Sequence, residues 1–189
     1  PIWKISGLFK RIKSKEDLEN FIQERSAHVS QTTLYGYLKT RIGVKYIAMM
    51  EDEVFLKSIN IAKWNIYVVA LADCAFYVFS YLISEKNLKK NDCKEIFLNI
   101  LENEKKNGLS DEIFDRGKKN FLERLDKVNF SSYHLNDPFK ESGQALYYWS
   151  PIADELKSLD KKIVLNSIHL KWGLIKDEFK KLTRNLKFD

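Results

Sequence analysis

Apolar positions along most of the chain recur at intervals of three and four residues, the spacing of one face of an α-helix. Capping residues and glycines separate these segments, and no segment shows the sustained alternation of a β-strand. Only seven glycines and three prolines interrupt a sequence rich in Lys, Glu and Leu, which favours long helices. The pattern predicts an all-α fold, a single-domain bundle of about six to eight helices with a buried central apolar helix.

Local start and stop signals give the expected helix boundaries. Ser14 resembles an N-cap and Gly43 a C-terminal stop, and Ser110 has the position of another N-cap. Pro138 and the Ser150-Pro151 pair are expected to open further helices, and Asp160 to cap the last one. The first expected helix begins after Ser14. The later helices are expected at 53–85, 91–108, 110–128, 138–149, 151–159 and from 160 onward.

The last of these helices carries apolar residues spaced 4, 3, 4, 3 and 4 apart, which forms a seam of less than three heptads. Such a seam indicates a helix packed inside the bundle, with a short coiled coil to a partner as the alternative. Its members are Ile168, Trp172, Ile175, Phe179, Leu182 and Leu186.

Residues 66–83 form the most apolar run and contain one charged residue, Asp73. Its strongly apolar residues favour membrane insertion by roughly 4 kcal/mol in total, and a central Asp costs about 2.5 to 3.5 kcal/mol. Three tyrosines reduce the remainder, and the length lies at the lower end of the range for a spanning helix. The sequence therefore favours a core helix over a membrane span. A buried Asp73 then needs a partner, for which Arg25, Lys39, Arg41 and a tyrosine hydroxyl are candidates.

The net charge of +6 is concentrated at the two ends of the chain. Residues 1–15 carry five bases and no acid, and residues 161–187 carry eight bases and two acids. We therefore divide the chain into a basic amphipathic arm, 1–15, and a helical domain, 16–189. The arm is expected to bind an anionic membrane surface or a partner, or else to pack on its own domain. The residues assigned to its binding are Trp3, Lys4, Phe9, Lys10, Arg11 and Lys13, and Ile12 is expected on the apolar side.

Motifs for several kinds of chemistry do not occur in the sequence. It contains no serine elbow, phosphate loop, dinucleotide fingerprint or zinc-protease motif. His28, His134 and His169 stand alone and Cys74 and Cys93 form no C-x-x-C pair, so no metal site, cofactor or catalytic residue is predicted. Reduced thiols in a cytoplasm or organelle matrix are the simpler interpretation of the two cysteines.

The densest polar stretch is residues 24–43, whose side chains share neighbouring helical turns. We predict a ligand or interaction face here, with a hydrogen-bonded helix interface as the alternative. The residues assigned to this face are Arg25, His28, Thr32, Tyr35, Lys39, Arg41 and the separate Asp73. Basic and aromatic residues also interleave near Trp172, but no RNA-binding module is recognisable and a nucleic-acid partner is not expected.

Two blocks of the chain resemble a family of uncharacterised all-helical proteins common in alphaproteobacteria. The blocks are "SQTTLYGYLKTRIGVKY", with "EDEVF" and "INIAKW" after it, and "YWSPIADELKSLDKKIVLNSIHLKW". Some members are labelled esterases, although this sequence contains no serine elbow to match that label. The resemblance implies an all-helical fold and a bacterial cytoplasmic or mitochondrial setting, not a reaction.

Together these features favour a non-enzymatic helical accessory or interaction protein, such as a subunit or assembly factor of a larger complex at a membrane face. The expected partner is another protein, with an anionic membrane surface as a further partner. The expected location is the cytoplasm or the mitochondrial matrix, including the inner membrane face. The alternative is a small-molecule-binding protein or a hydrolase-like enzyme that uses the Arg25–Arg41 face with Asp73.

Overall fold

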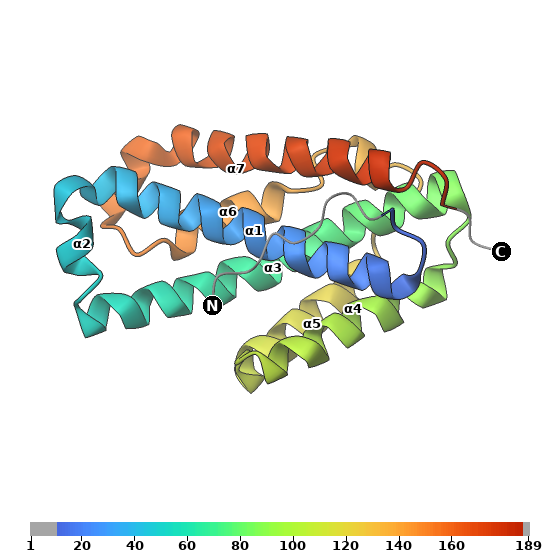
Figure 1. The fold of residues 1–189 in the computed structure, drawn as a ribbon, viewed down its shortest axis with the longest axis horizontal. Coiled ribbons are helices and arrows are strands. Elements are labelled where there is room, and N and C mark those ends of the chain that lie inside the picture. The colour runs from blue at the N-terminus through green and yellow to red at the C-terminus, as the bar shows by residue number, and fades with distance from the viewer. Residues whose placement is uncertain (1–10, 187–189) are drawn as a thin grey trace.

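The computed structural model describes residues 11–186, and these residues form a bundle of α-helices without a β-strand (Figure 1). The predicted all-α, single-domain fold is confirmed. Six helices have ten or more residues, and α2 and two 3₁₀ turns are shorter. The elements are α1 (Lys15–Ile42), η1 (Gly43–Lys45), α2 (Tyr46–Met49), α3 (Glu53–Lys86), α4 (Lys90–Lys106), α5 (Asp111–Leu125), η2 (Tyr133–Leu135), α6 (Lys140–Trp149) and α7 (Asp154–Leu182).

Helix α3 runs the length of the molecule and contacts α1, α4, α5 and α6 (Figure 1). It begins at Asp52, whose carboxylate accepts a hydrogen bond from the Phe55 amide at 2.8 Å. It ends at Asn87, which takes a left-handed conformation with φ 59°. The helix is long and apolar enough to cross a membrane, and 83% of its most apolar window is buried inside the bundle. The apolar run 66–83 is therefore the central core helix, as predicted.

The local signals around α1 also act as predicted. The Ser14 hydroxyl accepts a hydrogen bond from the Asp17 amide at 3.1 Å, and the Asp17 carboxylate accepts one from the Ser14 amide. This reciprocal pair is a capping box, which satisfies two amides at the helix start. At the other end Gly43 has φ +63°, a conformation that costs little without a Cβ atom.

Helices α4 and α5 form an antiparallel pair that covers one side of α3 (Figure 1). Phe97 of α4 and Phe121 of α5 stack with their ring centroids 3.7 Å apart, and Phe121 also stacks on Phe76 of α3 at 4.9 Å. Gly117 lets α5 approach α3 closely, because a Cβ atom there would lie 2.6 Å from a methyl carbon of Val68. These aromatic contacts bury the apolar faces of all three helices.

Helix α7 differs from the prediction at its start. It begins at Asp154 and continues through Asp160, so the two predicted helices 151–159 and 160 onward are one. Asp160 does not cap it, because its carboxylate accepts a hydrogen bond from Tyr37 and pairs with Arg41 of α1. No helix-breaking residue separates the two segments. The prolines also precede their helices by more than predicted, since α6 begins at Lys140.

The predicted seam of α7 packs inside the bundle, where all six of its members are buried. The first of the two alternatives for this seam is therefore correct. Phe179 reaches Phe21 of α1, with ring centroids 5.1 Å apart. Trp172 stacks on Phe139 at 4.3 Å.

The N-terminal arm lies mostly outside the described residues, including its predicted contacts Trp3, Lys4, Phe9 and Lys10. Arg11 and Lys13 are exposed. Ile12 is buried in the core, and its amide donates a hydrogen bond to the Leu182 carbonyl at 3.3 Å. The burial of Ile12 beside the end of α7 agrees with the alternative expected for the arm, packing on its own domain.

Candidate functional site

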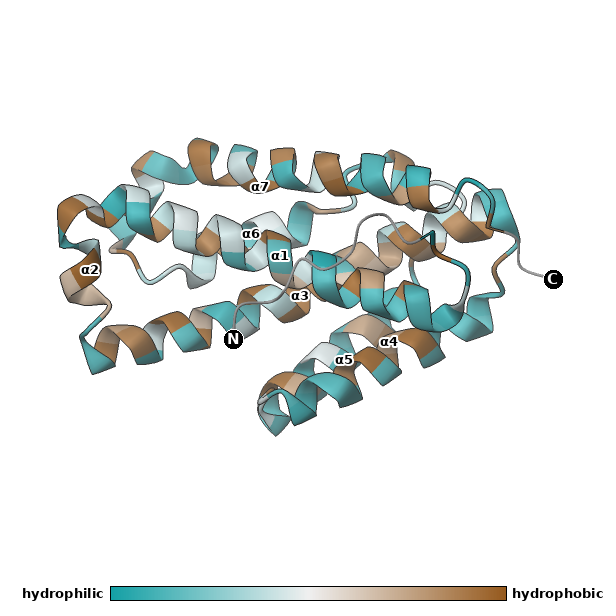
Figure 2. Cartoon of the chain, viewed as in Figure 1, coloured by the Kyte–Doolittle hydropathy of each residue, from teal (hydrophilic) through white to brown (hydrophobic). Residues whose placement is uncertain are grey.

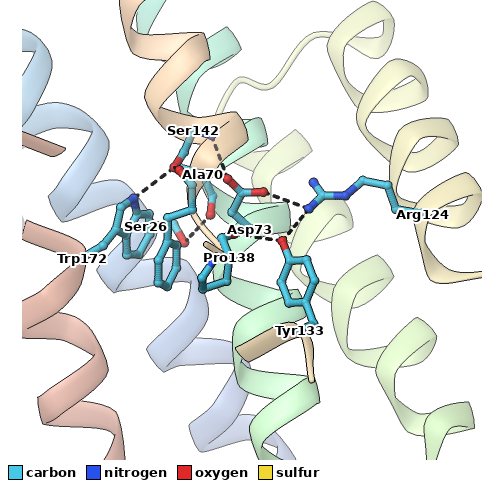
Figure 3. A network of polar contacts seen from close by, with 9 residues as sticks. Ser26, Ala70, Asp73, Arg124, Tyr133, Pro138, Ser142 and Trp172 are labelled. Carbon is cyan, nitrogen blue, oxygen red and sulfur yellow. Dashed lines mark hydrogen bonds and ion pairs between the residues drawn. The ribbon is translucent and has the colours of Figure 1, made fainter. Parts of the chain in front are cut away.

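A buried polar network surrounds Asp73 in the middle of α3 (Figure 3). The side chain of Asp73 is fully buried, and each carboxylate oxygen accepts one hydrogen bond. Arg124 of α5 donates to one oxygen at 2.9 Å, and the backbone amide of Ser142 in α6 donates to the other at 2.7 Å. Asp73 therefore ties three helices together at one point.

The network extends from Asp73 in two directions (Figure 3). On one side the same Arg124 nitrogen also donates to the Tyr133 hydroxyl at 2.8 Å, and that hydroxyl donates to the Pro138 carbonyl at 2.8 Å. On the other side the indole N–H of Trp172 in α7 donates to the Ser142 hydroxyl at 3.0 Å. The network thus connects α7 to α5 through the core, and both oxygens of the buried Asp73 carboxylate are satisfied as burial demands.

Burial sets the protonation of this network. It raises the pKa of Asp73 to about 6, although Arg124 and the Ser142 amide favour the charged carboxylate and oppose this shift. Burial also raises the pKa of Tyr133, and the neighbouring Asp73 charge adds to that effect. Asp73 is therefore ionised above about pH 6, where it forms an ion pair with Arg124.

A surface groove of about 550 Å³ lies beside this network, between α3, α5 and the start of α6. Its floor is apolar and its rim carries charges of both signs. Arg124 lines the groove while its guanidinium reaches inward to Asp73. We call this hollow the Arg124 groove; its lining is Val68, Val69, Ala72, Gly117, Asn120, Glu123, Arg124, Lys127, Tyr133, Asp137, Lys140 and Glu141.

Sequence reasoning missed Arg124 as the partner of Asp73. Three of the proposed partners, Arg25, Lys39 and Arg41, lie on α1, and none of them contacts the carboxylate. One signal did exist: Arg124 follows Phe121 by three residues, so it shares a helical face with a residue of the apolar stripe. A charged residue in that position indicates a tertiary partner, but it does not tell which element supplies it.

Two arginines of the predicted α1 face connect α1 to α7. Arg25 makes a bidentate pair with Glu178, with N···O distances of 2.8 and 2.7 Å. This pairing raises the pKa of the guanidinium. Arg41 lies 3.0 Å from the Asp160 carboxylate. The two pairs are about 24 Å apart along α1, so they join the helices at separate points.

The other members of this face are spread along α1. Thr32 donates its hydroxyl hydrogen to the His28 carbonyl of its own helix at 2.7 Å. Burial lowers the pKa of His28, and the nearby Lys171 and Arg25 lower it further. Burial raises the pKa of Tyr35, which is half-buried, and Lys39 is exposed. None of them contacts Asp73, so the α1 residues and Asp73 do not form one site.

The remaining groups with chemical potential are buried or dispersed. Cys74 and Cys93 are free thiols in the core, and burial raises the pKa of each to about 12. Such thiols are poor nucleophiles at neutral pH. Among residues 11–186, no three His, Cys, Asp or Glu side chains gather as metal ligands would.

A second hollow of about 150 Å³ lies between α1, α3 and α4. Its buried charged residue is Glu104, whose carboxylate accepts hydrogen bonds from the buried Tyr67 hydroxyl at 2.6 Å and from the amide groups of Gln23 and Asn107. Neutral donors alone thus satisfy Glu104. Burial and the Glu104 charge raise the pKa of Tyr67, so Tyr67 keeps its proton as a donor.

Helix α7 presents a second apolar row on the side opposite its buried seam. We call this set the outer row, and its five side chains are 42 to 75% exposed. Figure 2 shows hydrophobic segments repeating along the whole of α7. The outer row consists of Leu156, Leu159, Ile163, Leu170 and Leu174.

The outer row follows a heptad spacing. Asn166 and Gly173, both exposed, complete the intervals of 3, 4, 3, 4 and 3 that begin at Leu156, and Leu174 adjoins the last of them. A row of this length extends about 27 Å along the helix. No residue from 11 to 186 covers these side chains, so α7 carries one buried and one unpartnered seam.

Comparison of the chain with protein-family models, with curated proteins and with solved structures gives no match.

Proposed function

We propose that this chain is a non-enzymatic helical interaction protein, a subunit or assembly factor that docks a partner helix on the outer row of α7. The observation that carries the proposal is the row of five exposed aliphatic side chains, four of which occupy heptad positions. Single exposed apolar residues are common on protein surfaces, but contiguous rows mark interaction sites. A strict heptad row is the pattern by which one helix packs against another.

Charge identifies the kind of helix that fits. Between Leu159 and Leu174 the charged residues of α7 are three lysines and one aspartate. That aspartate, Asp160, already pairs with Arg41 of α1. Lys162 and Lys171, which flank the outer row, have no ion-pair partner among the described residues, whereas Lys161 lies on the face of the inner seam, seven residues before Ile168. The complementary partner is therefore an amphipathic helix with acidic residues beside its apolar seam.

The same features disfavour two other occupants. A second copy of this chain would bring the lysines of one α7 against those of the other, which opposes association. A membrane surface suits a broad apolar face with Trp or Phe, whereas the outer row is narrow and contains no aromatic residue. Asn166 near its centre resembles the polar residue that sets the register in coiled coils.

Site-specific photo-crosslinking in the native host tests this proposal. A photoreactive residue at position 163 is expected to capture a peptide with heptad apolar residues and flanking acids, identified by mass spectrometry. The matched control carries the same group at Lys119, an exposed position on α5. Capture of a second copy of the chain, capture of lipid, or equal capture from position 119 would each overturn the proposal.

The setting of this interaction follows from the charge at the chain ends. We place the protein in a bacterial cytoplasm or a mitochondrial matrix, with its basic arm directed to an anionic membrane face. The exposure of Arg11 and Lys13 supports this placement. Deleting residues 1–10 should weaken co-sedimentation with anionic liposomes at low salt. Equal sedimentation of the full and shortened chains would remove the membrane from this proposal.

A further inference from the structure

Arg124 is held in place from three directions. Its Nη2 donates to Asp73 at 2.9 Å and to Tyr133 at 2.8 Å. Its guanidinium carbon lies 4.6 Å from the centroid of the Phe76 ring, which is a cation–π contact. A guanidinium fixed in this way loses little conformational entropy when it binds something else.

The guanidinium keeps donors that the network does not use. The hydrogen bonds to Asp73 and Tyr133 both come from Nη2. Nε and Nη1 have no hydrogen-bond partner in the described part of the chain. Because the side chain is 27% exposed and lines the groove, these donors are accessible from solvent.

The floor of the groove next to Arg124 is apolar. Val68, Val69 and Ala72 from α3 line it on one side. On the other side the backbone of α5 at Gly117 lines the groove and packs directly against Val68. The floor can therefore accept a short hydrocarbon chain, while water retains access to the rim.

Further polar groups stand around the rim. Asn120 lies about one turn before Arg124 on α5, Lys127 lies in the turn that follows this helix, and Lys140 lies at the start of α6. Three acids, Glu123, Asp137 and Glu141, also line the rim. They make the groove unfavourable for polyanions such as nucleic acid, because repeated negative charges would meet them.

We propose that the Arg124 groove binds a small organic anion, with its single carboxylate or phosphate head on Arg124 and Lys127 and its apolar part on the floor. The head accepts hydrogen bonds from Nε and Nη1 of Arg124. The apolar part contacts Val68, Val69 and Ala72. This site is separate from the outer row of α7 and does not depend on the function proposed for that row.

A ligand site at Arg124 explains why a carboxylate is buried at position 73. Buried ion pairs contribute little net stability compared with apolar residues of the same size. Here the carboxylate orients a guanidinium at the wall of a hollow, which is the arrangement expected of a residue that positions a ligand-binding group. Asp73 is accordingly a positioning residue, and Arg124 is the residue that contacts the ligand.

Titration of the ¹⁵N-labelled chain with defined probes tests this site by amide chemical shifts. The probes are acetate, hexanoate, inorganic phosphate, hexyl phosphate and hexylammonium. We expect hexanoate or hexyl phosphate to shift the amides of Val68, Val69 and Gly117 and to bind about tenfold more tightly than acetate or inorganic phosphate. The tighter of the two hexyl anions identifies the head group. Hexylammonium should not bind.

Variants make the test specific to the groove. Arg124→Gln should abolish binding, and because it leaves Asp73 without its charged partner, two milder variants accompany it. Lys127→Gln should weaken the hexyl anion several-fold, and Val69→Phe should fill the floor and remove the preference for the longer chain. Lys119→Gln, outside the groove on the same helix, is the matched control. Equal effects of Lys119→Gln and Lys127→Gln, binding of hexylammonium, or absence of shifts at the floor would each overturn the proposal.

Discussion

The two apolar faces of α7 both follow a heptad pattern, but one face is buried in the bundle and the other is exposed. The inner seam contains Trp172 and Phe179, which are at most 1% exposed, and it packs on α1 and α6. The outer row contains only Leu and Ile and stands in solvent. The inner face is also tied to α3 and α5 through the hydrogen bond from Trp172 to Ser142.

Periodicity alone therefore shows that a helix has an apolar face, but not which protein buries that face. Side-chain size separates the two seams of α7, since aromatic residues fill a core with large area and specific ring contacts. Neighbouring charge separates them too, because lysines beside the outer row remain hydrated. A row without aromatics and with hydrated neighbours on a folded helix indicates a site for a partner.

The largest expected difference between the two faces is in stability. Trp172→Ala removes a buried ring stacked on Phe139 and a hydrogen bond to Ser142. It should lower the free energy of unfolding by about 3–5 kcal/mol. Leu170→Ala on the outer row should change it by less than about 0.5 kcal/mol. Urea denaturation of both variants measures this, and comparable losses would show that the outer row is part of the fold.

Variants of the Asp73 network, which Trp172 of the inner seam joins through Ser142, should give the second-largest loss of stability. Arg124→Leu leaves the buried Asp73 carboxylate without its charged partner, which should cost about 3 kcal/mol at pH 7.5. Asp73→Asn combined with Arg124→Leu should cost less than Arg124→Leu alone, because no buried charge then remains. Urea denaturation of Arg124→Leu, of Asp73→Asn and of the double variant tests this order. A loss in the double variant equal to the sum of the two single losses would show that the two residues do not interact energetically.

The pH dependence of stability should also distinguish the Asp73 network from the outer row. The folded pKa of Asp73, about 6, lies above its ordinary value of 3.8, so the folded state binds this proton more tightly than the unfolded chain. The stability that the folded state gains from this tighter proton binding is therefore fully present below about pH 4 and is lost as the pH rises through about 6.

The difference in unfolding free energy between the wild type and Asp73→Asn should be more favourable to the wild type at pH 4 than at pH 7, by up to about 3 kcal/mol. Leu170→Ala should leave the wild-type profile unchanged. A constant difference between wild type and Asp73→Asn from pH 4 to pH 7 would contradict the raised pKa.

Much of the fold is readable from local sequence signals. The Ser14 cap, the Ser110 cap and the Gly43 stop act through groups within a few residues of each other. The central position of α3 follows from a run whose apolar residues cover every side of the helix. Signals that involve a distant partner were misread, as when Asp160 was assigned to a helix cap and not to Tyr37 and Arg41.

The candidate sites were harder to predict for the same reason. Asp73 was recognised as a residue that needs a partner, but the partner Arg124 is 51 residues away. The order of helix packing decides that distance in space, and no local spacing encodes it. The outer row is equally hard to recognise, because the inner seam of α7 overlaps the same stretch of sequence and gives the stronger signal.

Binding of designed peptides is the sharpest test of whether the outer row binds an acidic helix. Three peptides share one heptad Leu seam and carry Glu, Gln or Lys at the flanking positions. Fluorescence anisotropy should show the tightest binding for the Glu peptide, then Gln, then Lys, with the order compressed at high salt. Ile163→Glu with Leu170→Glu should abolish binding without unfolding the chain. Equal affinity for all three peptides, or unchanged binding to this double variant, would contradict the account.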